Sequence, residues 1–205
     1  MRYLALGDST SIDKYTGVQS GGAVSQFSSL INADEVQDLT HDGFTTDAVI
    51  ESLARVRIHP DIITLTVGGN DLLQRPSWNV DRNSLEDPDT QETLNKLRYI
   101  FLELYEYRCK VIVNTIHDPT DGNETLMQQL GMSVQFRSAY EEINQEIRQM
   151  GQIHGFLLSD LQQLFVGHGI NSTDTWVTME IEPNFAGATA IAKRWHELFL
   201  ETEKG

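Results

Sequence analysis

Cysteine is nearly absent from this chain, because Cys109 is the only one among 205 residues. No disulfide can therefore form within the chain, and we expect Cys109, which precedes an apolar run, to be a buried and inert thiol. No apolar stretch approaches the roughly 18 residues that a membrane span needs. The first residues lead directly into a short apolar run, which is too short for the core of a secretory signal. These absences favour a cytoplasmic protein.

Positive charge is also scarce. Lysine and arginine together number 15 against 30 aspartates and glutamates, which leaves a formal net charge of −15. This excess of carboxylates repels phosphate backbones and anionic lipid headgroups, so nucleic acid and membrane surfaces are poor candidate partners. We interpret the charge as a solvated acidic surface. The length is that of one domain, which we expect to span residues 1–205.

Short apolar runs alternate with longer helical patterns along the chain, which predicts parallel strands joined by helices in a three-layer α/β sandwich. The expected strands are residues 2–6, 35–39, 61–67, 110–116 and, more weakly patterned, 156–159. The expected helices are residues 45–57, 90–107, 133–150 and 185–201. Residues 75–92 are polar and without clear periodicity, so we expect a loop insertion there.

Residues suited to acyl-transfer chemistry follow the first three expected strands. Gly7-Asp8-Ser9 would project a hydroxyl above the sheet edge, Asp42-Gly43 offers an unobstructed backbone N–H, and Gly68-Gly69-Asn70-Asp71 adds a side-chain amide. Each motif alone is as well explained by a turn, with Asp8 or Ser9 as a local cap. Together they predict an oxyanion hole made by the N–H groups of Ser9 and Gly43 and the side chain of Asn70.

In their order and spacing these motifs resemble the first three blocks of the SGNH (GDSL) hydrolase family. The resemblance implies a flavodoxin-like sheet of strand order 2-1-3-4-5, with Ser9 as the nucleophile and Ser9, Gly43 and Asn70 as the oxyanion hole. It also implies hydrolysis of small-molecule esters, or sometimes thioesters, without a metal or other cofactor. The G-x-S-x-G motif of the other large hydrolase class is absent.

The last block departs from this family, which has Asp-x-x-His-Pro before its final helix. Aligned on Pro183-Asn184, this chain has Met179 at the position of the acid and Glu182 at the position of the base. Glu182 could accept the proton from Ser9 if burial raised its pKa from about 4.3 by a couple of units. Alternatively, a histidine from another loop could serve. The candidates are His117, His168 and His41.

Two functions remain open at this stage. The first is a serine esterase that cleaves a small or moderate-sized acyl ester through an acyl-enzyme on Ser9, with a non-standard proton acceptor. The second is a catalytically impaired protein of the same fold that acts as a binding or interaction module. Neither is expected to hold a metal or phosphate, because His41-Asp42 and His117-Asp118 lack diagnostic metal-ligand spacing and no Lys-Ser/Thr follows Gly68-Gly69.

Overall fold

The computed structural model describes residues 1–73, 90–130, 132 and 134–202, without the side chains of residues 134 and 135. Its central sheet has five parallel strands in the order β2-β1-β3-β4-β5. This is the flavodoxin-like α/β architecture expected from the sequence. The strands are β1 (Arg2–Gly7), β2 (Glu35–Thr40), β3 (Ile62–Thr66), β4 (Lys110–Asn114) and β5 (Leu157–Ser159).

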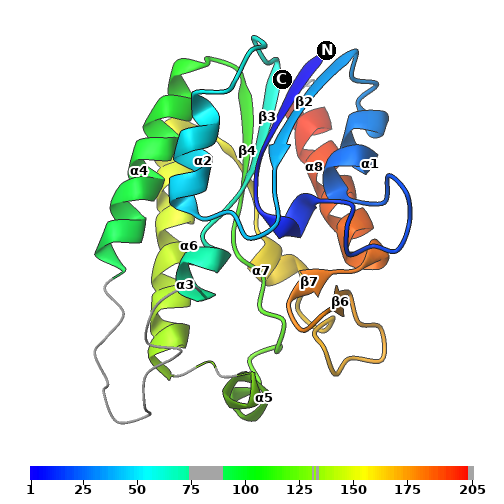
Figure 1. The fold of residues 1–205 in the computed structure, drawn as a ribbon, viewed down its shortest axis with the longest axis vertical. Coiled ribbons are helices and arrows are strands. Elements are labelled where there is room, and N and C mark those ends of the chain that lie inside the picture. The colour runs from blue at the N-terminus through cyan, green and yellow to red at the C-terminus, as the bar shows by residue number, and fades with distance from the viewer. Residues whose placement is uncertain (74–89, 131, 133, 203–205) are drawn as a thin grey trace.

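Helices cover both faces of the sheet (Figure 1). One face carries α2 (Thr46–Leu53), α4 (Gln91–Glu106) and α6 (Val134–His154), and the other carries α1 (Ala23–Leu30) and α8 (Phe185–Thr202). Short elements lie mostly where the strands end. They are the 3-10 helix η1 (Ser9–Ser11), α3 (Gly69–Leu73), α5 (Glu124–Gln129), α7 (Leu161–Leu164) and the hairpin of β6 (Val177–Thr178) with β7 (Glu182–Pro183).

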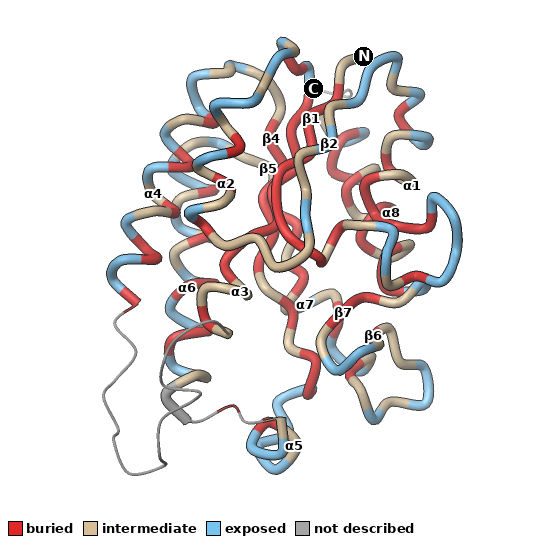
Figure 2. Tube along the Cα trace, viewed as in Figure 1, coloured by how far each residue is buried: buried red, intermediate tan, exposed pale blue. Residues whose placement is uncertain are grey.

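The period of two along each strand divides the buried side chains between two cores. Leu4 and Leu6 of β1 face the core under α2, α4 and α6, whereas Tyr3 and Ala5 face the core under α1 and α8. Figure 2 shows the buried residues concentrated along the central strands. Burial on both faces explains why these strands are nearly continuous apolar runs in the sequence.

One polar link crosses the core under α1 and α8. The indole N–H of Trp195, on α8, donates to Asn114 Oδ1 at the end of β4 at 2.8 Å, and Asn114 Nδ2 donates to the main-chain oxygen of Leu65 at 2.8 Å. Both side chains are buried. The link ties the last helix to β3 and β4, and it thereby helps to place β7, immediately before α8, relative to the sheet.

The expected elements agree with the observed ones except at their ends and for short segments. The helix expected at 45–57 ends at Leu53, and the strand expected at 110–116 ends at Asn114, three residues before His117. Most of the loop expected at 75–92 lies outside the described residues, and α4 already begins at Gln91. None of the helices in the described part of the chain is long and apolar enough to cross a membrane.

Candidate active site

Ser9 lies directly beyond the carboxyl end of β1, where a glycine makes the turn possible. Gly7 has φ +138, and a Cβ atom at this position would be 2.1 Å from the main-chain oxygen of Thr66. Asp8 then caps η1, with Oδ1 accepting from the N–H of Thr10 at 3.1 Å. The capping role considered for Asp8 is thus confirmed, and it places Ser9 at the first position of η1.

A cavity opens beside Ser9 at the carboxyl ends of the strands. Its volume is about 60 Å³, counted as the space that the centres of water-sized groups can occupy. Ser9, Asn70, His117 and Glu182, which come from four separate segments of the sequence, all line it. The apolar part of its wall consists of Leu72, Leu73, Ile116, Pro119, Met127, Met132, Phe136, Tyr140 and Ile181.

Glu182 is a buried carboxyl next to the nucleophile candidate. The residue is 7% exposed and sits on β7, paired with Thr178 of β6. Burial raises the pKa of Glu182 to about 7, and the Ser9 side chain offsets part of that rise. Near neutral pH a large fraction of the Glu182 carboxyls is therefore ionised and able to accept a proton.

The two other expected oxyanion donors occupy adjoining loops. Asn70, at the start of α3, lines the cavity, and its Nδ2 donates to the main-chain oxygen of Phe44 at 2.9 Å. Because an amide nitrogen carries two hydrogens, a second one is left for another acceptor. Gly43 is not among the cavity-lining residues but precedes Phe44, and its φ of +77 is a left-handed conformation that favours glycine.

The three candidate histidines have different surroundings. His117 is 7% exposed, lines the cavity, and donates from Nε2 to the main-chain oxygen of Ile181 at 2.8 Å. His41 stacks on Phe44 and His168 stacks on Trp176, and neither lines the cavity. Of the three, only His117 is brought to Ser9 and Glu182.

Two polar contacts near the site are not indicated by the sequence. Asp71 accepts from the N–H of Thr46 at 3.0 Å and from its hydroxyl, which anchors the start of α2. Asp118 pairs with Arg137 at 3.0 Å in the cavity wall. These contacts join residues 19 or more positions apart, and no local motif indicates them. In the parts of the chain that are described, no three His, Cys, Asp or Glu side chains are grouped to hold a metal ion.

Met179, at the position where the family has its acid, is not among the residues that line this cavity. It lies in the turn between β6 and β7, is 71% exposed, and has φ +46. Glu180, next to it, also has a left-handed φ, of +73. The segment that ends in Glu182 thus enters the site through a tight hairpin turn.

Solved structures with this fold span nearly the whole chain. An acetyl xylan esterase, AlAXEase, superposes with a TM-score of 0.71 at 16% identity, covering 96% of this chain and 98% of that one. A phospholipase A1 from Streptomyces albidoflavus NA297 gives 0.67 at 16%, covering 98% of both chains. An acetylxylan esterase from Geobacillus stearothermophilus gives 0.70 at 15%, covering 96% and 93%. At such identities the likeness establishes the fold.

Comparison with curated protein sequences finds no significant match. The sequence profile of the GDSL-like lipase/acylhydrolase family, in contrast, matches residues 5–190, which include Ser9, Asn70 and Glu182. The chain therefore belongs to the GDSL-like lipase/acylhydrolase family, a family of carboxylic ester hydrolases of the esterase/lipase type.

Proposed function

We propose that this protein is a serine esterase that forms an acyl-enzyme on Ser9, with Glu182 as the proton acceptor. The observation that carries the proposal is that Ser9 and the buried carboxyl of Glu182 line the same apolar cavity, where the Ser9 side chain acts on the pKa of Glu182. A carboxylate of ordinary pKa is a weak base toward a hydroxyl. Burial brings the pKa of Glu182 to about 7, where a general base operates effectively near neutral pH.

In the first half-reaction, Ser9 Oγ attacks the ester carbonyl carbon and its proton passes to the Glu182 carboxylate. The oxyanion formed is stabilised by the N–H groups of Ser9 and Gly43 and by Asn70 Nδ2. One such donor contributes roughly 3 kcal/mol of transition-state stabilisation. The carbon–oxygen bond to the alcohol then breaks, and the leaving oxygen takes the proton from Glu182. Water releases the acid by the same steps, and Ser9 regains its proton.

His117 suits a supporting role better than that of the base, because the Ser9 side chain acts on the pKa of Glu182 and not on that of His117. A main-chain carbonyl can only accept, so His117 Nε2 must carry the hydrogen that it shares with Ile181. The remaining nitrogen, Nδ1, is buried and has no hydrogen-bond partner among the described residues. Burial also lowers the pKa of His117, so the ring stays neutral. Its contact with Ile181 positions the residue directly before Glu182.

The size of the cavity favours an ester with a short acyl or alkyl group. The space open to the centres of water-sized groups is about 60 Å³, which exceeds what a single water needs and is small for a long chain. The wall around that space is largely apolar, with methionines from α5 and from the segment before α6. We therefore assign it a short acyl or alkyl chain, with small-molecule esters as substrates.

A fluorophosphonate probe and a chromogenic ester test the proposal together. We expect the probe to add covalently to Ser9, detected by intact mass and peptide mapping, and the wild type to hydrolyse p-nitrophenyl acetate. Ser9→Ala should lose both, whereas Ser11→Ala, a nearby buried serine in the same 3-10 helix, should keep both. Labelling elsewhere, or binding of esters without turnover, would instead favour the impaired binding protein.

A further inference from the structure

The turn that carries Gly43 is held by its own residues and by the two loops beside it. The N–H of Phe44 donates to the main-chain oxygen of His41 at 3.3 Å, and the N–H of His41 donates to that of Gly7 at 3.0 Å. Asn70 Nδ2 donates to the oxygen of Phe44 at 2.9 Å. This one turn thus connects the end of β1, which leads to Ser9, with the side chain of Asn70.

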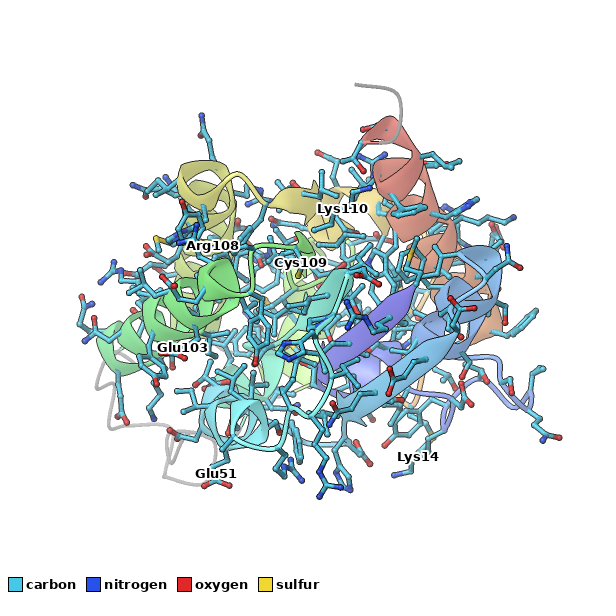
Figure 3. The ribbon with its side chains drawn as sticks, turned by 90° about the horizontal axis from the view of Figure 1, so that it is seen from above. Lys14, Glu51, Glu103, Arg108, Cys109 and Lys110 are labelled. Carbon is cyan, nitrogen blue, oxygen red and sulfur yellow. The ribbon has the colours of Figure 1, made fainter. Side chains whose placement is uncertain are left out.

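The carboxylate of Asp42, also in this turn, is held from the loop that follows η1. Its Oδ2 accepts a hydrogen bond from the Tyr15 hydroxyl at 2.8 Å and forms an ion pair with Lys14. Lys14 Nζ lies 4.8 Å from the centre of the Tyr15 ring. Figure 3 shows Lys14 at the periphery of the molecule, beside β2 at the edge of the sheet. Two neighbouring side chains therefore reach across to one carboxylate.

The main chain of Asp42 is restrained as well. His41 Nδ1 donates to the main-chain oxygen of Asp42 at 2.9 Å, and the His41 ring stacks on Phe44 with 5.0 Å between centroids. That oxygen and the N–H of Gly43 belong to the same planar peptide group, which is trans. Holding the carbonyl and the side chain of Asp42 therefore sets the direction of the Gly43 N–H.

We propose that Lys14 and Tyr15 are positioning residues that hold Asp42 so that the Asp42–Gly43 peptide keeps its N–H aimed for oxyanion stabilisation. The inference rests on the function proposed above, in which Gly43 is an oxyanion donor. Donors accelerate the reaction only when their direction is set before charge develops. The Lys14 side chain is 59% exposed, and exposed ion pairs contribute little to folding stability. Catalysis and stability should therefore respond differently to its loss.

A simple electrostatic effect on Glu182 is the alternative explanation, and it has a distinct signature. The groups that act on the pKa of Glu182, besides its burial and Ser9, are the carboxylates of Asp8 and Asp42, which raise it, and Lys14, which lowers it. Tyr15, in turn, is affected by the charge of Glu182. Neutralising Lys14 should therefore raise the apparent pKa of catalysis, and neutralising Asp42 should lower it. Loss of positioning would instead lower the pH-independent kcat in both variants.

The test compares Lys14→Met, Tyr15→Phe and Asp42→Asn in the full chain. We expect each to lower the plateau kcat for p-nitrophenyl butyrate by about 10-fold, less than the roughly 100-fold that follows loss of a whole donor. KM and the urea unfolding midpoint should stay unchanged, and Lys14→Arg should restore most of kcat. Lys96→Met is the matched control, because Lys96 forms a similar ion pair with Asp47 and does not line the cavity.

A pair of inhibitors isolates the oxyanion. A trifluoromethyl ketone adds to Ser9 and forms an oxyanion, whereas the matching methyl ketone binds without that step. The three variants should lose about 10-fold in affinity for the first and none for the second. An unchanged plateau kcat, or a loss explained wholly by the shifted pKa or by unfolding, would overturn this inference alone. Wild type that neither hydrolyses esters nor prefers the trifluoromethyl ketone would overturn the proposed function with it.

Discussion

His117 Nε2 and the main-chain oxygen of Ile181 are joined by a hydrogen bond of 2.8 Å, one residue before Glu182. The bond connects the segment after β4 to the hairpin that brings Glu182 to Ser9. His117 also packs against Phe165, with 4.6 Å between ring centroids. Its ring is thus fixed on two sides, and a fixed ring is a suitable support for the strand beside it.

Replacing His117 with glutamine should preserve this support. The Gln side chain can still donate to the carbonyl of Ile181, so we expect kcat within about fivefold of wild type and an unchanged pH profile. His117→Ala leaves that carbonyl without its donor and should lower both kcat and stability, the latter by roughly 1–3 kcal/mol. Steady-state kinetics between pH 5 and 9 and urea unfolding check both variants. A loss of 100-fold or more in His117→Gln would identify His117 as the base.

The rate should rise with pH as Glu182 loses its proton. Because only the carboxylate accepts the Ser9 proton, and burial raises the pKa of Glu182 to about 7, kcat should follow one ionisation near pH 7. Glu182→Gln should lower kcat by about 100-fold or more and abolish that pH dependence. The measurement is kcat for a p-nitrophenyl ester across pH 5 to 9. If kcat of Glu182→Gln still changed at the same pH, the ionisation would belong to another group.

Glu182 should also make the folded state less stable as the pH rises. The pKa of an unperturbed glutamate is 4.5 and that of Glu182 in the folded protein is about 7, so between these values the folded state holds a proton that the unfolded state has lost. Stability from this group is full below pH 4.5 and falls until about pH 7. Glu182→Gln should therefore exceed wild type in stability at pH 8 by up to roughly 3 kcal/mol.

Urea unfolding at pH 5 and pH 8 measures this difference, which should shrink at the lower pH. Glu180→Gln, two residues away in the exposed turn, is the matched control and should show no such pH-dependent gain. An equal gain in stability for Glu182→Gln at both pH values would show that burial of the ionised carboxylate does not destabilise the folded protein. A gain in stability at pH 8 alone would show that the ionised carboxylate of Glu182, the proposed base, destabilises the folded protein.

The length of the substrate chain should be limited by Met127. This residue is 3% exposed and lines the cavity, so Met127→Ala opens space at the expense of packing. We expect wild-type kcat/KM to peak at short chains and the variant to peak about two to three carbons longer. We would vary the acyl chain and the alcohol chain of the ester separately, which identifies the part of the substrate that occupies the cavity. Met179→Ala, in the exposed turn, is the control, and an unshifted optimum in Met127→Ala would contradict the assignment.

The sheet and the loops at its carboxyl edge could be predicted because strands buried on both faces leave a strong apolar signal. Ser9, Asn70 and Glu182 could be proposed from their order along the chain, and they meet in one cavity. Helix α1 escaped detection because its eight residues include only a short apolar face, and β6 and β7 have two residues each. Two residues are too few for a period to show.

The positioning contacts around the site could not be predicted at all. Lys14 and Asp42 are separated by 28 residues, and Thr46 and Asp71 by 25. Such pairs depend on how two loops meet at the sheet edge, which propensity and pattern do not specify. The burial of Glu182 likewise depends on how the hairpin of β6 and β7 folds. The sequence shows that the proposed chemistry needs a raised pKa at Glu182, but it does not show that this residue is buried.

The left-handed turn at Met179 and Glu180 has a consequence for attempts to rebuild a Ser-His-Asp triad in this chain. An aspartate substituted for Met179 would point into solvent, because the residue is 71% exposed, and so it could not orient a histidine substituted for Glu182. A histidine base needs such a partner to select its tautomer, whereas a carboxylate has two equivalent oxygens and needs none. Conversion would thus require a different backbone path between β6 and α8, whereas the proposed pair of Ser9 and Glu182 needs no such path.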